Sequence, residues 1–256
     1  MKISHGVFLS PGLSAQKWLK HGFGTRQTEP DFLRKGSRWK VVRAKQVHSD
    51  IIHIVDGPAK LRGDALITAT PGVALAVSTA DCLPVLLADP ENRVVAAIHA
   101  GWRGTLKRIT QKAVGLMHAR FGSNPAKLLA AFGPGIQVCC YEVGMEVVDE
   151  FRSQFSYGEE LFDKLEPVNP ALVMLPRQHL AGAHAVMREL EDQHAFLNVE
   201  EANLRQLLEA GVPRARIMRG APCTACRLDV LHSYRKEGPG QGHQQSAIGI
   251  VTGKTN

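Results

Sequence analysis

Three short apolar runs lie close together in the first half of the chain. They span residues 73–77, 84–88 and 94–98, and no charged residue interrupts them. Runs of this length are typical of strands that are buried on both faces. The turn sequence Asp-Pro-Glu-Asn at 89–92 separates the last two runs and is short enough for a hairpin. The pattern therefore predicts a sheet that is at least partly antiparallel, and it argues against a purely parallel, doubly wound fold.

Helical periodicity follows the third run. Apolar residues recur along one face from Thr105, which offers an N-cap, to Gly122, where the pattern stops. Another helix is predicted to begin at Asn198, because Glu201 stands three residues later as in a capping box. The remaining predicted elements are strands over 128–132 and 246–251 and helices over 142–155 and 181–190. Together these elements predict an α+β fold: a single-domain sandwich of mixed β-sheets with flanking helices over residues 1–256.

Composition narrows the class of protein. Apolar residues make up 44% of the chain and charged residues 21%, which is ordinary for a globular enzyme. No apolar run approaches the roughly 18 to 20 residues that cross a bilayer, and the N-terminus lacks the apolar stretch of a signal peptide. Five cysteines, an odd number, do not suggest a disulfide framework. We therefore expect a cytoplasmic protein in a reducing compartment, with no membrane partner.

The net charge of +7 favours anionic ligands such as phosphate. The lysines and arginines are scattered along the chain, however, and no aromatic-rich basic stripe for base stacking accompanies them. We therefore expect no nucleic-acid partner. Arg26 and Arg103 are candidate anion-binding residues, because a guanidinium group binds phosphate through two hydrogen bonds. An ordinary surface arginine is an equally good interpretation of each.

Reactive side chains follow the apolar runs. Cys82 comes after the run at 73–77, His99 directly follows the run at 94–98, and His48 lies upstream after Val41-Val42. A rigid strand that ends in such a residue is a common support for a site. One cysteine and two histidines match catalytic zinc sites that leave a fourth position open, although the same ligands also suit copper.

Each of these residues also has an ordinary structural interpretation. A buried cysteine is usually a small apolar side chain of the core, and a single histidine is usually a residue of the surface or of the edge of the core. Cys223-x-x-Cys226 could form half of a structural zinc site with Cys139-Cys140, or a redox pair. Both interpretations of the four cysteines stay open.

At these residues the chain resembles the YfiH family of laccase-domain proteins, once called multicopper polyphenol oxidases. The resemblance runs through most of the sequence and rests on these motifs in this order: Gly22-Phe23-Gly24-Thr25-Arg26, Gln46-Val47-His48, Gly63-Asp64-Ala65-Leu66-Ile67-Thr68, Thr79-Ala80-Asp81-Cys82-Leu83-Pro84-Val85, His99-Ala100-Gly101-Trp102-Arg103-Gly104, Gly133-Pro134-Gly135-Ile136, Cys139-Cys140-Tyr141-Glu142-Val143-Gly144, Cys223-Thr224-Ala225-Cys226 and Ser233-Tyr234-Arg235-Lys236-Glu237-Gly238.

The resemblance implies a fold and an activity. It implies a single α+β sandwich related to certain bacterial deamidating toxins, with one metal, usually zinc, on His48, Cys82 and His99. It further implies phosphorolysis of the purine nucleosides adenosine, inosine and 5′-methylthioadenosine, with deamination of adenosine as a side activity. Catalysis would then fall to His48, Cys82 and His99, and the candidate anion-binding residues Arg26 and Arg103 are expected, from their own chemistry, to bind the substrate.

Two departures from the family pattern bear on substrate choice. Gln27-Thr28-Glu29-Pro30 stands where the family has a Gly-Gly-x-Ser loop, and Gln241-Gly242-His243 stands in place of Thr-Gly-Arg. If these segments shape the nucleoside or phosphate pocket, substrate choice here differs from that of the family.

Two other enzyme activities and a binding role remain alternatives. One is a metal-independent Cys82–His99 amidase or hydrolase, for example in the editing of cell-wall precursors. Another is a copper-dependent polyphenol oxidase, which is disfavoured because multicopper laccases hold their coppers largely with His-x-His pairs and this chain contains none. The last is a binding module without catalysis.

Overall fold

The structure is a computed structural model, and it describes residues 1–4, 6–28, 33, 39–163 and 194–252. The chain divides into two compact units. The first comprises Met1–Ile136 with Val199–Asn256, and the second comprises Gln137–Asn198. The expectation of one domain over 1–256 stays a prediction.

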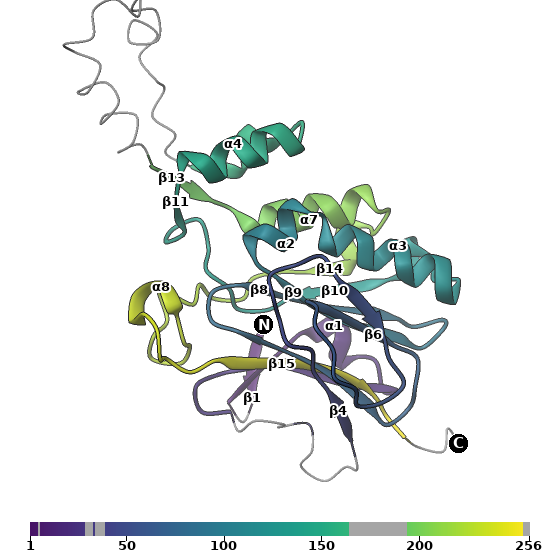
Figure 1. Ribbon diagram of the computed structural model, residues 1–256. Coiled ribbons are helices and arrows are strands. Elements are labelled where there is room, and N and C mark those ends of the chain that lie inside the picture. The colour runs from purple at the N-terminus through teal and green to yellow at the C-terminus, as the bar shows by residue number, and fades with distance from the viewer. Residues whose placement is uncertain (5, 29–32, 34–38, 164–193, 253–256) are drawn as a thin grey trace, which may run out of the picture. The chain divides into compact units, whose positions relative to one another are not determined.

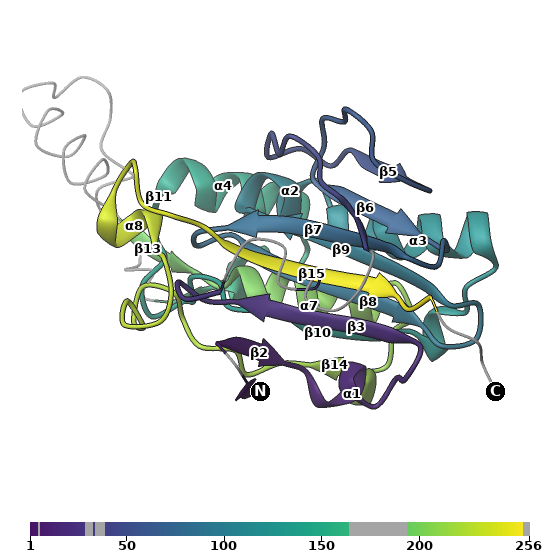
Figure 2. The ribbon, with the colours of Figure 1, turned by 90° about the horizontal axis from the view of Figure 1, so that it is seen from below.

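The first unit contains two six-stranded sheets. In the first sheet the strand order is β1 (Lys2–Ser4), β2 (Val7–Leu9), β3 (Leu19–Gly24), β15 (Gln244–Ile250), β7 (Val73–Thr79) and β4 (Lys40–Val42). Its neighbours pair antiparallel except β4 and β7, which are parallel. Figure 2 shows β7, β15 and β3 side by side across this sheet. The carboxyl-terminal strand thus lies between two strands from the first third of the chain.

The second sheet carries the hairpin that the sequence predicts. Its strand order is β14 (Ile217–Met218), β10 (Leu129–Phe132), β8 (Leu83–Asp89), β9 (Val94–Ala100), β6 (Ala65–Thr68) and β5 (Ile52–Ile54). Strands β8 and β9 pair antiparallel over their whole length, whereas β5–β6 and β10–β14 are parallel. The sheet is therefore mixed, as expected.

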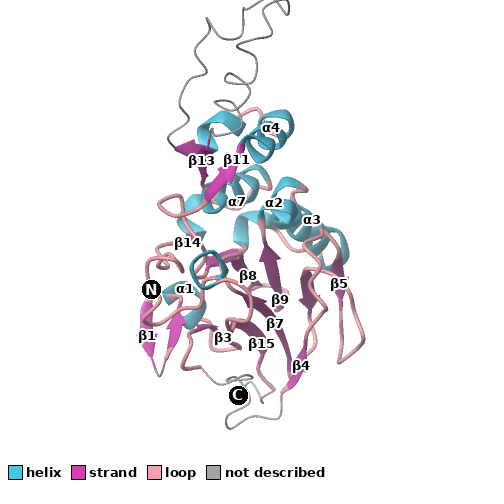
Figure 3. Cartoon of the chain, turned by 60° about the vertical axis from the view of Figure 1, so that its left-hand side comes forward, coloured by secondary structure: helices cyan, strands magenta, loops and turns pink. Residues whose placement is uncertain are grey.

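The main core of the first unit lies between the two sheets. Alternate residues of β7 and β15, such as Leu75 and Ile248, meet Leu86 and Val95 from β8 and β9, and all four are 0% exposed. Helices α2 (Trp102–Leu106), α3 (Ile109–Phe121) and α7 (Val199–Glu209) cover the other face of the second sheet (Figures 1 and 3). Because β8 and β9 lie between two apolar layers, both of their faces are buried, and this explains their uninterrupted apolar runs.

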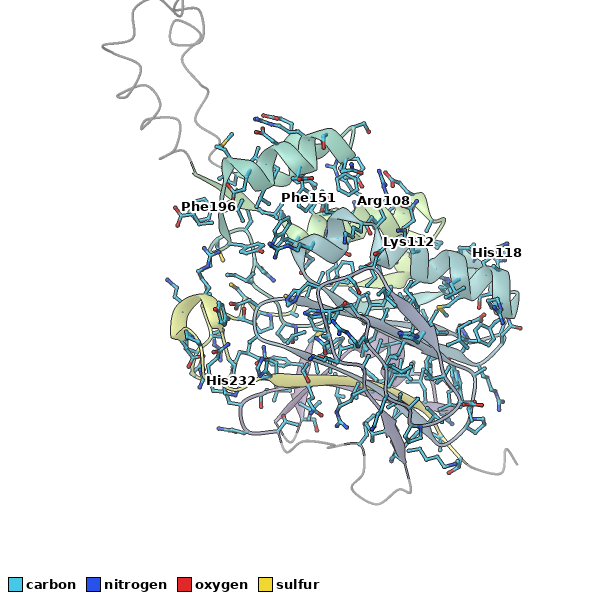
Figure 4. All side chains as sticks on the ribbon, viewed as in Figure 1. Arg108, Lys112, His118, Phe151, Phe196 and His232 are labelled. Carbon is cyan, nitrogen blue, oxygen red and sulfur yellow. The ribbon has the colours of Figure 1, made fainter. Side chains whose placement is uncertain are left out.

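Short elements complete the first unit. They are α1 (Pro11–Ser14), α8 (Tyr234–Glu237) and the 3₁₀ turns Pro125–Lys127 and Arg214–Arg216. Figure 4 shows Arg108 and Lys112 at α3 and His232 beside the start of β15. Among the described residues, no helix has both the length and the apolar character that a membrane span requires.

The second unit is a small sheet with one helix. Strands β11 (Glu142–Gly144), β13 (His194–Leu197) and β12 (Phe162–Asp163) pair antiparallel in that order. Helix α4 (Met145–Gln154) is followed by the 3₁₀ turn Gly158–Leu161. The Phe151 ring on α4, labelled in Figure 4, lies 5.7 Å from the Phe155 ring and 6.0 Å from the Phe162 ring, centroid to centroid. Aromatic packing thus forms the core of this unit.

The α+β sandwich of mixed sheets with flanking helices is confirmed, but two predicted helices have wrong boundaries. Thr105 is not an N-cap: it lies inside α2, and α3 starts only at Ile109, because Arg108 adopts a left-handed conformation with φ 61° that separates the helices. The predicted helix over 142–155 begins instead at Met145, since residues 142–144 pair with β13 as a strand. The predicted helix over 181–190 lies outside the described residues.

Candidate metal centre

The structure brings His48, Cys82 and His99 together in the first unit. Their ligand atoms all lie within 4.8 Å of one another. The Cys82 Sγ atom lies 3.8 Å from Nε2 of His48, and the two imidazole rings are 5.0 Å apart, centroid to centroid. His48 comes from the loop before β5, Cys82 from the turn between β7 and β8, and His99 from β9. Residues that lie up to 51 positions apart in the sequence therefore form one cluster of sulfur and nitrogen donors.

A buried carboxylate holds the loop that carries His48. The Asp64 carboxylate accepts hydrogen bonds from the backbone N–H groups of Val47, His48 and Ser49, at 3.2, 3.0 and 2.7 Å, and from the Ser49 hydroxyl at 2.6 Å. Backbone N–H groups that converge in this way form a nest for an anion. His48 itself has φ 56°, a left-handed conformation that few residues adopt. The loop is thus wrapped around Asp64, and this fixes the position of His48.

Gln46 attaches the same loop to the first sheet. Its side-chain oxygen accepts from the Ser78 N–H at 2.8 Å, and its side-chain nitrogen donates to the Ser78 carbonyl at 2.7 Å. An amide side chain can thus pair with a strand as a neighbouring backbone would. The segment around His48 is consequently held to both sheets of the sandwich.

Asp64 also orients His99. Nδ1 of His99 lies 2.8 Å from the Asp64 carboxylate, and the two residues are only 3% and 1% exposed. Because Nδ1 is occupied, Nε2 is the ring nitrogen that remains for a ligand. A carboxylate behind a histidine is the usual arrangement of metal-binding imidazoles, where it fixes the tautomer and the ring orientation.

Sequence reasoning did not select Asp64 as a site residue. A signal was present: a carboxylate stands directly before the apolar strand at 65–68, where an unpaired charge would be costly to bury. One of its hydrogen-bond partners, His99, lies far from Asp64 in the sequence, however. No local spacing pattern therefore connects the two residues.

Gly101 leaves room beside the cluster. A Cβ atom at this position would lie 2.9 Å from the Cys82 Sγ and 3.2 Å from Cδ2 of His48. Any larger residue would displace the ligand side chains. The glycine after the His99 strand is therefore required by close packing around the donors.

Electrostatic interactions within the cluster favour an anionic sulfur. Burial would raise the pKa of the Cys82 thiol, but hydrogen bonds with His48 and His99 and their positive charge outweigh burial and lower it. Burial would lower the pKa of His99, but the Asp64 carboxylate and the Cys82 sulfur outweigh burial and raise it. For Asp64, burial is outweighed by the hydrogen bonds of His99 and Ser49, which hold its pKa well below the usual range. Thiolate is the form of cysteine that binds metals and acts as a nucleophile.

The donor set fits a metal ion. One thiolate and two imidazoles, one of them backed by a carboxylate, are the chemistry of catalytic zinc sites, and they also suit copper. The cluster is a possible metal site, and its residues do not identify the metal.

Arg26 lies two residues after the end of β3 and contacts both α8 and the segment before it. Its backbone N–H donates to the Val230 carbonyl at 2.9 Å, its Nε donates to the Leu231 carbonyl at 2.8 Å, and its guanidinium pairs with Glu237. Through these three contacts Arg26 connects the segment after β3 to the C-terminal segment. Its predicted role in substrate binding stays a prediction.

Arg103 is exposed on α2, two residues after Gly101. Its guanidinium lies 4.3 Å from the ring centroid of its neighbour Trp102, a cation–π contact. It therefore stands on the helix that starts directly after the His99 strand. Its predicted role in binding substrate likewise stays a prediction.

All five cysteines lie among the described residues, and none forms a disulfide. Cys223 is buried and pairs with Gly135 through an isolated parallel bridge, while Cys226 is exposed. Cys139 and Cys140 belong to the second unit. A structural zinc site or a redox pair at these cysteines stays a prediction.

Comparison with known proteins identifies the family. Residues 32–251 match the sequence profile of the family described as multi-copper polyphenol oxidoreductase laccase, so the chain belongs to this laccase-domain family. The chain is similar to a Deinococcus radiodurans protein named purine nucleoside phosphorylase, with 50% identity over 55% of each chain. It therefore spans about half the length of that relative. It is also 32% identical, over 81% of its length and 74% of the relative, to adenosine deaminase RL5 from an unknown prokaryotic organism.

Solved structures agree with this assignment. The crystal structure of Bacillus licheniformis YfiH superposes with a TM-score of 0.75 at 28% identity, over 91% of this chain and 94% of that one. YlmD from Geobacillus stearothermophilus superposes with a TM-score of 0.74 at 24% identity, over 98% of both chains. The second likeness shows the shared fold alone.

Proposed function

We propose that this chain is a zinc-dependent purine nucleoside phosphorylase acting on adenosine, inosine and 5′-methylthioadenosine, with adenosine deamination as a side activity. The observation that carries the proposal is the convergence of the His48, Cys82 and His99 ligand atoms within 4.8 Å. The names of the relatives, purine nucleoside phosphorylase and adenosine deaminase, supply the two reactions.

His48, Cys82 and His99 would hold the zinc ion. When bound, zinc supplies a positive charge that polarises oxygen atoms and lowers the pKa of a bound water. The contribution of the chain is to prepare the donors: Asp64 fixes the orientation of His99 and the course of the His48 loop, and Gly101 keeps the space beside Cys82 open. Donors that are already oriented lose little conformational freedom when the ion binds.

Phosphorolysis needs an anion site as well. In this reaction a phosphate oxygen forms a bond to C1′ of the ribose while the bond from C1′ to the purine nitrogen breaks, and the departing base takes up a proton. Arg26 and Arg103 are the proposed phosphate-binding residues, and the net charge of +7 favours anions in general. Arg26 would exchange its Glu237 partner for phosphate, one anion for another at the same guanidinium.

The test is a product analysis. Zinc-loaded protein, incubated with adenosine and phosphate, should release adenine and ribose 1-phosphate, and a smaller amount of inosine with ammonia. Cys82→Ala should abolish all of these products. His53→Gln, a histidine substitution five residues from His48 on β5, serves as the control and should retain activity. Absence of both adenine and ribose 1-phosphate from the zinc-loaded wild type would overturn the proposal.

The lowered pKa of Cys82 favours a second candidate, a metal-independent Cys82–His99 hydrolase that cleaves amides. Treatment with a metal chelator distinguishes this hydrolase from the phosphorylase. Such a hydrolase would keep its activity in the presence of a chelator and lose it on alkylation of Cys82, whereas the phosphorylase proposed above loses activity in both treatments. A cytoplasmic location and the lack of nucleic-acid or membrane partners stay predictions.

A further inference from the structure

The residue before the Cys82 ligand has an unusual backbone conformation. Asp81 has φ 91°, in the region that favours glycine, although it carries a side chain. Such a conformation costs free energy and persists only where the surrounding structure enforces it. The contacts of Asp81 therefore show what holds the turn that presents Cys82.

Both carboxylate oxygens of Asp81 accept hydrogen bonds from the C-terminal part of the chain. The Thr224 hydroxyl donates to Oδ1 at 2.6 Å, and the Arg235 backbone N–H donates to Oδ2 at 2.7 Å. Thr224 is 0% exposed and Asp81 is 9% exposed, so water competes little for these bonds. Hydrogen bonds to a charged acceptor in such surroundings are strong.

The hydrogen bond from the Arg235 N–H to the Asp81 carboxylate caps α8, although the two residues lie far apart in the sequence. Arg235 is the second residue of α8, and the N–H groups in the first turn of a helix have no partner inside the helix. Ser233 caps the Lys236 N–H locally, and Asp81 satisfies the Arg235 N–H from 154 positions away. The start of α8 is therefore fixed to the residue that precedes Cys82.

The backbone of Asp81 closes a ring of contacts. Its carbonyl accepts from the Ile136 N–H at 2.8 Å, and the Gly135 carbonyl accepts from the Thr224 N–H at 3.1 Å. With the bond between Thr224 and the Asp81 carboxylate, these contacts connect three chain segments around a single residue. The ring holds the Asp81 peptide, and with it the start of Cys82.

We propose that Asp81 is a positioning residue, which fixes the Cys82 sulfur toward His48 and His99 by binding Thr224 and Arg235 with its carboxylate. The segment at 224–237 thereby becomes part of the support of the metal centre. Arg26 holds the same segment through Leu231 and Glu237, so the proposed phosphate residue and the Cys82 turn share one scaffold. The inference rests on the site described above and not on phosphorolysis.

Asp89 provides a matched control for a purely structural role. It lies at the opposite end of β8, is 0% exposed, and accepts backbone hydrogen bonds from Glu91 and Asn92 in the hairpin turn. Asp81 and Asp89 are thus two buried, hydrogen-bonded carboxylates on the two ends of one strand. Of the two, only Asp81 adjoins a metal ligand. Substitution of either aspartate should therefore reduce stability, but only substitution of Asp81 should change the metal centre.

The experiment compares Asp81→Asn, Thr224→Val, Thr224→Ser and Asp89→Asn with the wild type. Zinc affinity is measured by competition with a chromophoric chelator, and the rate at which iodoacetamide alkylates Cys82 in zinc-free protein is measured by peptide mass spectrometry. Asp81→Asn and Thr224→Val should weaken zinc binding by about tenfold, the lower end of the range known for groups that orient metal ligands, because Asp81 acts on Cys82 through the backbone. Both should also change the Cys82 alkylation rate. Thr224→Ser, which keeps the hydroxyl, should restore both values, and Asp89→Asn should lower only the melting temperature.

Zinc affinity and alkylation rate unchanged in Asp81→Asn and Thr224→Val would overturn the proposal, as would equal changes in Asp89→Asn. If Asp81→Asn fails to fold, the Thr224→Val and Thr224→Ser pair decides, since both retain Asp81. If the wild type binds no zinc, the alkylation rates decide alone. Failure of the phosphorylase proposal therefore leaves this inference testable.

Discussion

Asp64 and His99 are joined by two contacts in the first unit. The His99 imidazole lies 2.8 Å from the Asp64 carboxylate, and the His99 backbone N–H donates to the Asp64 carbonyl at 2.7 Å. The same carboxylate also binds the backbone of His48. One buried acid therefore sets the positions of two of the three donors.

Asp64→Asn should weaken zinc binding by about 10- to 100-fold, because an amide cannot accept all the hydrogen bonds that the carboxylate receives. Titration calorimetry of the zinc-free protein measures the change. Asp56→Asn, at an exposed position nearby, is the control and should bind zinc like the wild type. Equal affinity in Asp64→Asn and Asp56→Asn would show that Asp64 has no part in the centre.

Gly101→Ala should abolish zinc binding, because the added Cβ would lie 2.9 Å from the Cys82 Sγ. Gly115→Ala is the matched control: among the described residues, no atom beyond its chain neighbours and the backbone of α3 itself lies within 4 Å of the added Cβ. The control should bind zinc normally and gain about 1 kcal/mol in unfolding free energy, because alanine favours a helix over glycine. Normal zinc binding by Gly101→Ala would contradict the close packing described for the site.

His21 should make stability depend on pH. Burial lowers its pKa from 6.5 to about 4, and its neutral Nε2 accepts from the Ser10 N–H at 2.9 Å. Between pH 6.5 and 4 the unfolded chain takes up a proton that the folded chain does not, so the free energy of unfolding falls as pH falls. Between pH 7 and pH 5 the loss should be about 2 kcal/mol.

Denaturant unfolding at the two pH values measures this loss. In His21→Gln the amide oxygen can still accept from Ser10, and no titrating group remains at the position. The variant should therefore lose about 2 kcal/mol less than the wild type between pH 7 and pH 5. An equal pH dependence in both proteins would rule out His21 as the source.

Metal analysis separates the proposed zinc enzyme from a copper oxidase. Wild-type protein should bind one more equivalent of zinc than Cys82→Ala, because that variant lacks the thiolate ligand. Since the cluster of His48, Cys82 and His99 has the ligands for a single ion, copper loading of this site should also stop at one equivalent. Several coppers lost together in Cys82→Ala would favour the oxidase.

The local patterns of apolar residues predicted the strands well, because strands buried on both faces require continuous apolar runs. The runs at 73–77, 84–88 and 94–98 all lie in strands, since each strand packs against the core along its whole length. The helix break at Arg108 was missed because its left-handed conformation carries no signal in the residue type. Residues 142–144 were missed as a strand because their partner, β13, lies about fifty residues later.

The donors of the site were more predictable than their support. His48, Cys82 and His99 stand out as reactive side chains near strand ends, and the structure places them in one cluster. Asp64, by contrast, acts through partners up to 35 positions away, and Asp81 through partners up to 154 positions away. Contacts of this range follow from the sheet pairing and not from any local pattern in the sequence.

In the proposed metal centre, His48, Cys82 and His99 together bind one zinc ion. Anomalous diffraction at the zinc absorption edge, from crystals of zinc-loaded protein, would locate this ion. An anomalous peak is expected in contact with the Cys82 sulfur and with both imidazoles. Zinc-loaded crystals without a peak between these three side chains would contradict the proposed metal centre.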